Sequence, residues 1–292
     1  MTIMGNWIQI HYQIFWKALI EIEIKLVENE YNNFININKR EEELYYHIFL
    51  NNNKEEIKRN FLKEDEKNSK IKLILDHQVK SLSRLFQDCT SIKSVHFKKF
   101  YRKNINNMSY MLYGCSSLKE INFSNFNTDN VTNMEYMFCE CSSLEELDLS
   151  NFNTNNSTNM NAIFCRCSSL KDIYFPKFNT SNITDMSLMF YECSSLKGIN
   201  LTNFNTKKVT NMRDMFFGCS SLKKLDLSNF NTDNVTDLDE MFCECTALKE
   251  LDFPNFNIKN IDCLDDMLDP CSYKLKNKIK SQCKDKHFKS SW

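Results

Sequence analysis

Apolar residues recur along this chain with a fixed period of 26 residues. Cysteine marks the period most clearly, and the eight cysteines that follow it are Cys89, Cys115, Cys141, Cys167, Cys193, Cys219, Cys245 and Cys271. The surrounding residues repeat as well, so that units begin at residues 81, 107, 133, 159, 185, 211, 237 and 263. A strict period without insertions is typical of structural units that stack on one another.

Each unit contains three patterns, as the unit that begins at Asn133 illustrates. Apolar residues at its positions 2, 5, 6 and 9 have the spacing of one helical face. Residues 146–150 alternate between polar and apolar, which predicts a short half-buried strand. The following Asn/Thr-rich residues predict turns.

We therefore expect a short helix and a strand in most units. The helices should begin near residues 107, 133, 159, 185, 211 and 237. The strands should lie near residues 94–98, 120–124, 146–150, 172–176, 198–202, 224–228 and 250–254, with an extra strand at 70–75 opening the sheet. Stacked units would form an α/β repeat solenoid, with a parallel sheet on one side and short helices on the other.

The consensus NMxxMFxxCSSLxxLDLSNFNTxNVT contains the leucine-rich arrangement LxxLxLxxF, as in Leu144, Leu147, Leu149 and Phe152. It closely resembles the BspA-like leucine-rich repeat surface proteins of bacteria and protists. That resemblance implies a right-handed, leucine-rich-repeat-like solenoid with a role in binding or adhesion, often at a cell surface. It implies no catalytic residue.

The chain divides into three expected regions: residues 1–80 as a mainly helical N-terminal cap, residues 81–271 as a solenoid of eight repeats, and residues 272–292 as a basic C-terminal cap or tail. Residues 20–26 alternate strictly, which suits a strand, yet apolar residues from Ile8 to Leu26 are spaced like a helix seam, and a helix is favoured. Residues 41–50 and 54–66 also have a helical, polar pattern.

Composition limits the chemistry that the chain can perform. The formal net charge is -1, from 37 basic and 38 acidic side chains, which gives no general attraction to nucleic acid. The four glycines form no phosphate-binding loop and the five histidines no HExxH motif, so we expect no enzyme and no cofactor. The sequence contains no stretch of 18 apolar residues, so we expect no transmembrane anchor. The absence of a clear signal peptide favours the cytoplasm, whereas the family resemblance favours the cell surface.

Three ladders of equivalent residues invite structural and functional interpretations. The ladder cysteines suit core packing best, with disulfides and metal binding as alternatives. The phenylalanines at position 20 should form a buried spine. The asparagines at position 21 should bond main chain in neighbouring turns.

Specificity should lie at positions 14 and 16, the outward-facing strand residues. The candidate partner-binding residues there are Glu120, Glu146, Asp148, Asp172, Tyr174, Asp226, Glu250 and Asp252. This acidic row favours a cationic or mixed-charge protein or peptide partner and disfavours nucleic acid, and Tyr174 is the best single anchor. The function expected is a non-catalytic interaction module. The alternatives are a surface adhesin or spacer, and an ordinary solvated sheet face; the oligomeric state stays open.

Overall fold

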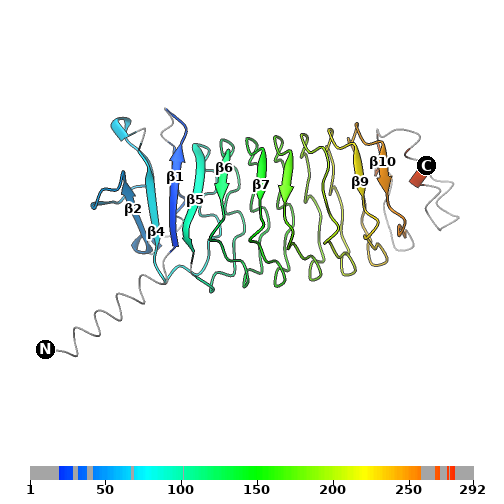
Figure 1. Cartoon of the computed structure of the whole chain (residues 1–292), viewed down its shortest axis with the longest axis horizontal. Helices are drawn as coiled ribbons and strands as arrows, with labels where there is room; N and C mark the ends of the chain where they lie inside the picture. The colour runs from blue at the N-terminus through cyan, green and yellow to red at the C-terminus, as the bar shows by residue number, and fades with distance from the viewer. Residues whose placement is uncertain are drawn as a thin grey trace, which may run out of the picture.

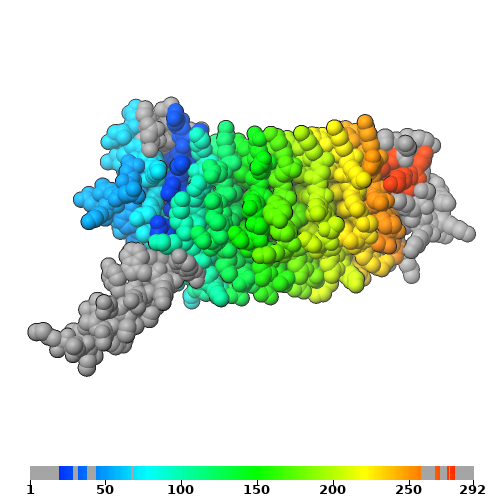
Figure 2. Space-filling model, in the orientation of Figure 1, coloured from blue at the N-terminus to red at the C-terminus, as the bar shows by residue number. Residues whose placement is uncertain are grey.

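The computed structural model describes residues 20–28, 32–37, 42–66, 69–100, 102–257, 267–269, 275 and 277–279. The repeats lie side by side along the long axis of the molecule, and antiparallel strands occupy the end nearer the N-terminus (Figure 1). In the space-filling view, successive repeats form parallel bands across an elongated body (Figure 2). We call residues 81–257 the repeat stack and the strands β1–β4 the end sheet.

The strands belong to three separate sheets. A six-stranded mixed sheet has the order β3-β2-β4-β1-β5-β6. Its strands are β1 (Ile20–Leu26), β2 (Tyr46–Leu50), β3 (Glu56–Ile57), β4 (Ile71–Leu75), β5 (Ile92–Phe100) and β6 (Glu120–Asn122). Two further sheets are parallel pairs: β7 (Glu146–Asp148) with β8 (Asp172–Tyr174), and β9 (Lys224–Asp226) with β10 (Glu250–Asp252). Two short 3₁₀ helices, η1 (Glu42–Tyr45) and η2 (Glu64–Glu66), lie in the N-terminal region.

The expected fold class, an α/β leucine-rich-repeat-like solenoid with helices on one side and a mainly helical cap, is wrong. The described residues form sheet and turns with almost no helix, and the sheet is mixed and divided. The segment at 198–202 forms no strand. It carries Gly198 where other repeats have Ser, Glu, Asp or Lys, and glycine weakens a strand because it loses more backbone entropy and packs no side chain.

Consecutive turns replace the helices expected near the start of each repeat. In the unit that begins at 107, the N–H of Met111 donates to the carbonyl of Met108 at 3.2 Å, whereas the N–H of Met108 donates across to Asn133 of the next repeat at 2.9 Å. The φ angles of Tyr110 (56°) and Gly114 (71°) are positive, as at the third residue of type II turns. Such a chain cannot form the continuous i→i−4 bonds of an α-helix.

The same two positions have positive φ in every described repeat. The residues concerned are Arg84, Asp88, Tyr110, Gly114, Tyr136, Glu140, Ala162, Arg166, Leu188, Glu192, Asp214, Gly218, Glu240 and Glu244. The turns nevertheless bury positions 2, 5, 6 and 9, as Met134, Met137, Phe138 and Cys141 show. A run of turns therefore buries residues at the same positions as one face of a helix would. For this reason the apolar pattern wrongly predicted helices.

The N-terminal region differs most from the expectation. Residues 20–26 form β1, so the helix favoured there is wrong and the alternation indicated the right structure. Strand β1 pairs antiparallel with both β4 and β5, so β4 is not a further parallel strand of the stack. Residues 41–50 form η1 and β2, and residues 54–66 contain β3 and η2, in place of two helices.

The core of the repeat stack is continuous with that of the end sheet. The predicted phenylalanine spine is buried throughout: Phe100, Phe126, Phe152, Phe178, Phe204, Phe230 and Phe256. A buried threonine at position 22 adds a polar connection between repeats. The hydroxyl of Thr180 donates to the carbonyl of Asn205 at 3.0 Å and accepts from its N–H at 2.8 Å. Thr128, Thr154 and Thr206 make the same paired contact.

Candidate partner-binding surface

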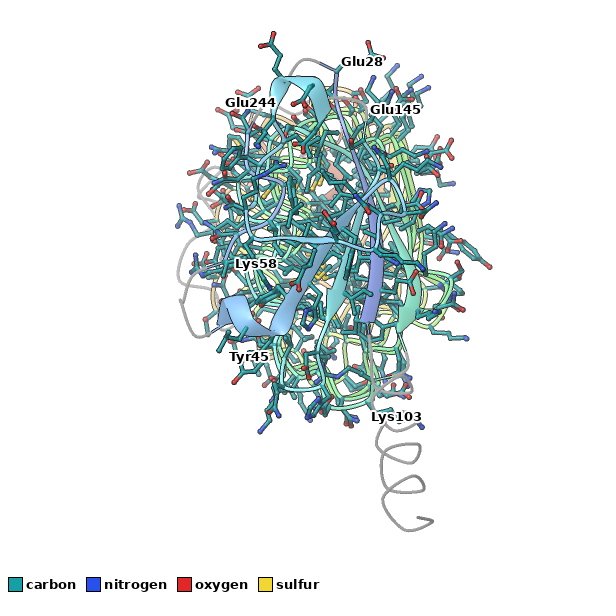
Figure 3. The ribbon with its side chains drawn as sticks, turned by 90° about the vertical axis from the view of Figure 1, so that its left-hand side faces the viewer. Glu28, Tyr45, Lys58, Lys103, Glu145 and Glu244 are labelled. Carbon is teal, nitrogen blue, oxygen red and sulfur yellow. The ribbon has the colours of Figure 1, made fainter. Side chains whose placement is uncertain are left out.

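The eight candidate residues lie on strands β6 to β10, and all of them are exposed. Because strand residues alternate between faces, positions 14 and 16 point outward while the residue between them faces the core. Leu147, between Glu146 and Asp148, is buried in this way. We call the consecutive turns at the start of each repeat the turn layer. In the view along the long axis, Glu145, beside the strand face, projects toward one side, and Glu244, on the turn layer, projects toward another (Figure 3).

The structure brings five of the eight residues together around one hollow. Its lining includes Glu120, Glu146, Asp148, Asp172 and Tyr174, with the chain of β6, β7 and β8 forming its floor. Tyr174 is 62% exposed, so its ring is available to a partner. We call these five residues the acidic hollow.

The carboxylates in the middle of the acidic hollow form no ion pair with a described side chain. Among the described residues, Glu146, Asp148 and Asp172 take part in no ion pair, while Glu120 lies 2.9 Å from Nε2 of His96. The nearby Lys171 pairs instead with Glu145 at 2.5 Å. Hydrogen bonding and attraction within that pair lower the pKa of Glu145 and raise that of Lys171. Lys119 also lines the hollow, and Lys171 is attracted to Glu146 and Asp172 as well, so the acids of the hollow outnumber the basic side chains near them without being isolated from those bases.

The other three candidates lie apart from the hollow, on the separate β9–β10 pair. There Glu250 is 3.4 Å from Nζ of Lys224, and Asp252 is 3.7 Å from Nζ of Lys278. Asp226 accepts hydrogen bonds from Ser228, and these bonds lower its pKa. The predicted row is thus divided into a group whose three central carboxylates form no ion pair and a group in which Glu250 and Asp252 pair with lysines.

Position 16 also has a structural task that sequence reasoning missed. Its side-chain oxygen accepts the N–H of position 18 and so closes the turn after the strand. This bond joins Asn122 to Ser124 (2.8 Å), Asp148 to Ser150 (2.8 Å), Asn200 to Thr202 (3.0 Å) and Asp226 to Ser228 (2.9 Å). Since Asn and Asp serve equally, the turn needs the oxygen but not the charge.

Tyr174 occupies position 16 in a repeat that has no such N–H to satisfy. Position 18 of this repeat is Pro176, and proline lacks an N–H. The turn therefore does not require an Asn or Asp at 174. The exposed ring does not contribute to the core either, so neither folding constraint accounts for a tyrosine here. Pro254 follows Asp252 in the same way, so Pro at position 18 frees position 16 from the turn without fixing which residue occupies it.

The ladder cysteines are packing residues of the turn layer. Cys115, Cys141, Cys167, Cys193, Cys219 and Cys245 are fully buried. Each donates to a carbonyl oxygen of the preceding repeat, at 3.0–3.3 Å. Burial raises the pKa of these thiols, for example those of Cys193 and Cys219. The burial expected for them is confirmed; Cys271 and Cys283 lie outside the described residues.

Within the described part of the chain, no three His, Cys, Asp or Glu side chains are grouped as metal ligands would be. In that same part, helical segments are too short and too polar for one of them to cross a bilayer.

The stacked 26-residue units define a repeat protein. A family model described as "Mycoplasma protein of unknown function, DUF285" matches residues 80–194 and 171–282. Because these overlapping matches cover more than half of the chain, the protein belongs to this family. The matched residues begin where the repeats begin, so the family is defined by the repeats rather than by the end sheet. A comparison with curated proteins gave no match.

Proposed function

We propose that the chain is a non-catalytic protein-interaction module that binds a cationic peptide segment of a partner protein in the acidic hollow. The observation that carries the proposal is the group of unpaired carboxylates, Glu146, Asp148 and Asp172, beside the exposed ring of Tyr174. An unpaired acidic group repels itself in the free protein, and a cationic partner relieves that repulsion.

The chemistry of the hollow favours arginine-containing segments. A guanidinium group can bond a carboxylate through two parallel N–H groups and can also stack on an aromatic ring. Successive strands lie about 4.8 Å apart, so carboxylates on β7 and β8 lie close enough for one guanidinium group to reach both. Nucleic acid is disfavoured because its phosphates would meet these carboxylates.

The repeat motif supports the same type of function. Its resemblance to the BspA-like surface proteins implies binding or adhesion, and both need an exposed recognition surface. The position-16 constraint supports it as well, because Tyr174 stands where folding demands no such residue.

The test is binding of a fluorescent peptide of alternating Arg and Gly, measured by anisotropy against a peptide of alternating Glu and Gly. The double variant Asp148→Asn/Asp172→Asn removes charge, and the Asn at 148 can still close its turn. We expect it to weaken binding of the Arg peptide about tenfold or more, and Tyr174→Ala to weaken it severalfold.

The matched control is Asp226→Asn, which removes the same charge at the same repeat position on β9 and leaves its turn intact. It should change affinity less than about twofold. Equal losses in all variants would mean that only the total charge matters, and the acidic hollow would not be the binding site. Stronger binding of the Glu peptide would reject the proposal outright.

A further inference from the structure

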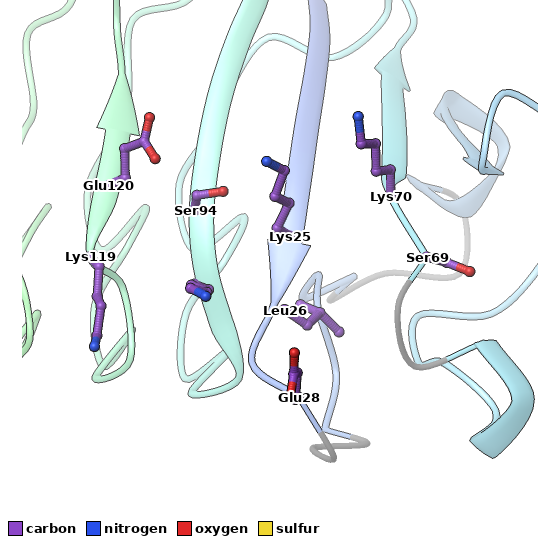
Figure 4. A pocket seen from close by; sticks show the side chains of 9 residues that line it. Lys25, Leu26, Glu28, Ser69, Lys70, Ser94, Lys119 and Glu120 are labelled. Atoms are coloured by element: carbon purple, nitrogen blue, oxygen red, sulfur yellow. The ribbon is translucent and has the colours of Figure 1, made fainter.

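A second cavity lies where the end sheet meets the first repeats. Its lining includes four lysines, Lys25, Lys70, Lys93 and Lys119, and two serines, Ser69 and Ser94. Figure 4 shows that they come from neighbouring strands that are distant in sequence. We call the four lysines the lysine pocket.

The sheet register places these residues in one row. Lys25 on β1 is opposite Ser94 on β5, and Ser94 is opposite Glu120 on β6. On the other side of β1, the pairing of Ile24 with Ile71 puts Lys70 next to Lys25. The side chains of Lys25 and Lys70 lie beside each other in Figure 4.

Lys93 and Lys119 occupy the next position along β5 and β6. The N–H of Lys119 donates to the carbonyl of Lys93 at 2.9 Å, so their backbones are in direct contact. Adjacent strands lie about 4.8 Å apart, and a lysine side chain reaches farther than that spacing. In Figure 4 the side chain of Lys119 extends away from those of Lys25 and Lys70, so the four ammonium groups can reach one small ligand only after a change of rotamer at Lys119.

Charge pairing on the outer face of β1 stops at this pocket. Glu21 is 2.9 Å from Nζ of Lys99, and Glu23 is 3.7 Å from Nζ of Lys98. The next outward residue, Lys25, is opposite a serine instead of an acid. Alternation of side chains along a strand thus gives two paired acids and then an unpaired base.

Within the described residues, none of the four lysines forms an ion pair with a carboxylate. Two acids line the same cavity, Glu28 and Glu120, and Glu120 is held beside His96. The four lysines therefore exceed the acids around the cavity. At longer range, Lys119 also contributes to lowering the pKa of Glu145. Mutual repulsion among the ammonium groups would be relieved by a bound anion.

The geometry points to a binding site for a compact oxyanion with at least two negative charges, a phosphate or sulfate group, in the lysine pocket. Ammonium groups are point charges that donate from several directions, which suits the oxygens of a tetrahedral anion. The group could be a free anion or an ester on a larger molecule.

This site is independent of the proposed peptide-binding function. The two cavities adjoin, since Lys119 and Glu120 line both, yet they have opposite charge. The variants that test the lysine pocket leave the acidic hollow unchanged. Failure of one proposal therefore leaves the other standing.

The experiment is isothermal titration of the full chain with inorganic pyrophosphate and, separately, with glucose 6-phosphate. Binding of pyrophosphate alone would identify a free anion as the ligand, and binding of the sugar phosphate would show that an ester fits. We expect the double variant Lys25→Gln/Lys70→Gln to weaken binding about tenfold or more. Lys93→Gln provides a second test if the double variant does not fold.

The matched control is Lys223→Gln. Lys223 is exposed and has the same repeat position as Lys93 and Lys119, but it lies just before β9, outside the cavity. It should leave affinity within about twofold of the original. If neither anion binds the intact chain, or if Lys223→Gln weakens binding as much as the pocket variants do, the proposal is overturned.

Discussion

The end sheet and the repeat stack satisfy their backbones in different ways. In the end sheet, β1 and β4 are seven and five residues long and bond their neighbours through ordinary antiparallel ladders. In the stack, strands such as β7 and β8 have only three residues. Most of the remaining contacts between repeats come from turns and from side chains that bond backbone. The stack is thus regular because particular side chains recur, whereas strand pairing forms the greater part of the contacts within the end sheet.

Strand β5 belongs to both regions and shows how they are joined. It spans nine residues in the first repeat because β1 pairs along its length, whereas the later repeat strands lack such a partner. A second connection uses Arg102, which occupies position 22 in place of the usual threonine. Its guanidinium donates to the carbonyls of Asp76 (2.7 Å), His77 (2.9 Å) and Val79. Arg102 therefore bonds backbone groups of the preceding segment, next to the end sheet, whereas each threonine at this position bonds backbone groups of the following repeat.

Removing this arginine should produce the largest effect, and it should be confined to the end sheet. Arg102 is 4% exposed, and burial lowers the pKa of its guanidinium. Arg102→Met should cost about 2–4 kcal/mol, because carbonyls near the junction lose a charged donor. Hydrogen-exchange mass spectrometry should show faster exchange in β1 and β4 and unchanged protection in the repeats from residue 133 onward.

The control is Arg102→Lys, which keeps the charge but cannot bond three carbonyls in a fixed geometry. It should give an intermediate loss. Equal loss of protection throughout the chain would show that the end sheet and the repeat stack unfold as one unit. The two regions would then have no separate stabilities.

A threonine in the stack should matter less than the arginine, but through the same type of contact. Thr180→Val keeps the shape of the side chain and removes the hydroxyl that bonds both backbone groups of Asn205. We expect a cost of about 1–3 kcal/mol in urea unfolding, since these backbone groups lose their partner. Thr180→Ser, which retains the hydroxyl, should recover most of the loss. If Val and Ser behaved alike, the threonine ladder would act by packing alone.

The sequence predicted the positions of the repeats and their core, but not their local structure. The period placed Phe178 and Cys193 in the core correctly because burial depends on spacing. It could not separate a helix from successive turns, which bury the same spacing. Positive φ at Tyr110 and Leu188 carries no sequence signal, since such bulky residues rarely adopt it.

The candidate surfaces were predicted to different extents. Outward acids were foreseen from strand alternation, yet their division was not. The sequence shows Glu146 on β7 and Lys224 on β9 at the same repeat position, but it does not show which acid Lys224 pairs with. Their neighbours decide the difference, as the pairing of Glu250 with Lys224 shows. The lysine pocket was missed entirely, since Lys25 and Lys70 belong to the non-repeating region and meet Lys93 only through the antiparallel pairing of β1.

The smallest predicted effect is the cost of adding a methyl group at a glycine. We expect a cost in the turns, where φ is positive, and none on the strand face, where there is space for the group. Gly114 has a φ of 71°, and an added Cβ would lie 2.4 Å from Oδ1 of Asp88. Gly114→Ala should cost about 1–2 kcal/mol, because the left-handed conformation disfavours any side chain. Gly198 lies on the strand face, where an added Cβ meets nothing within 4 Å. Gly198→Ala should therefore be neutral or should stabilise by about 0.4–1 kcal/mol, because it restricts the unfolded chain. Thermal melts of the two variants measure the effect of the same added methyl group at the two positions. A loss of stability at Gly198 equal to that at Gly114 would contradict the assignment of strain to the turns.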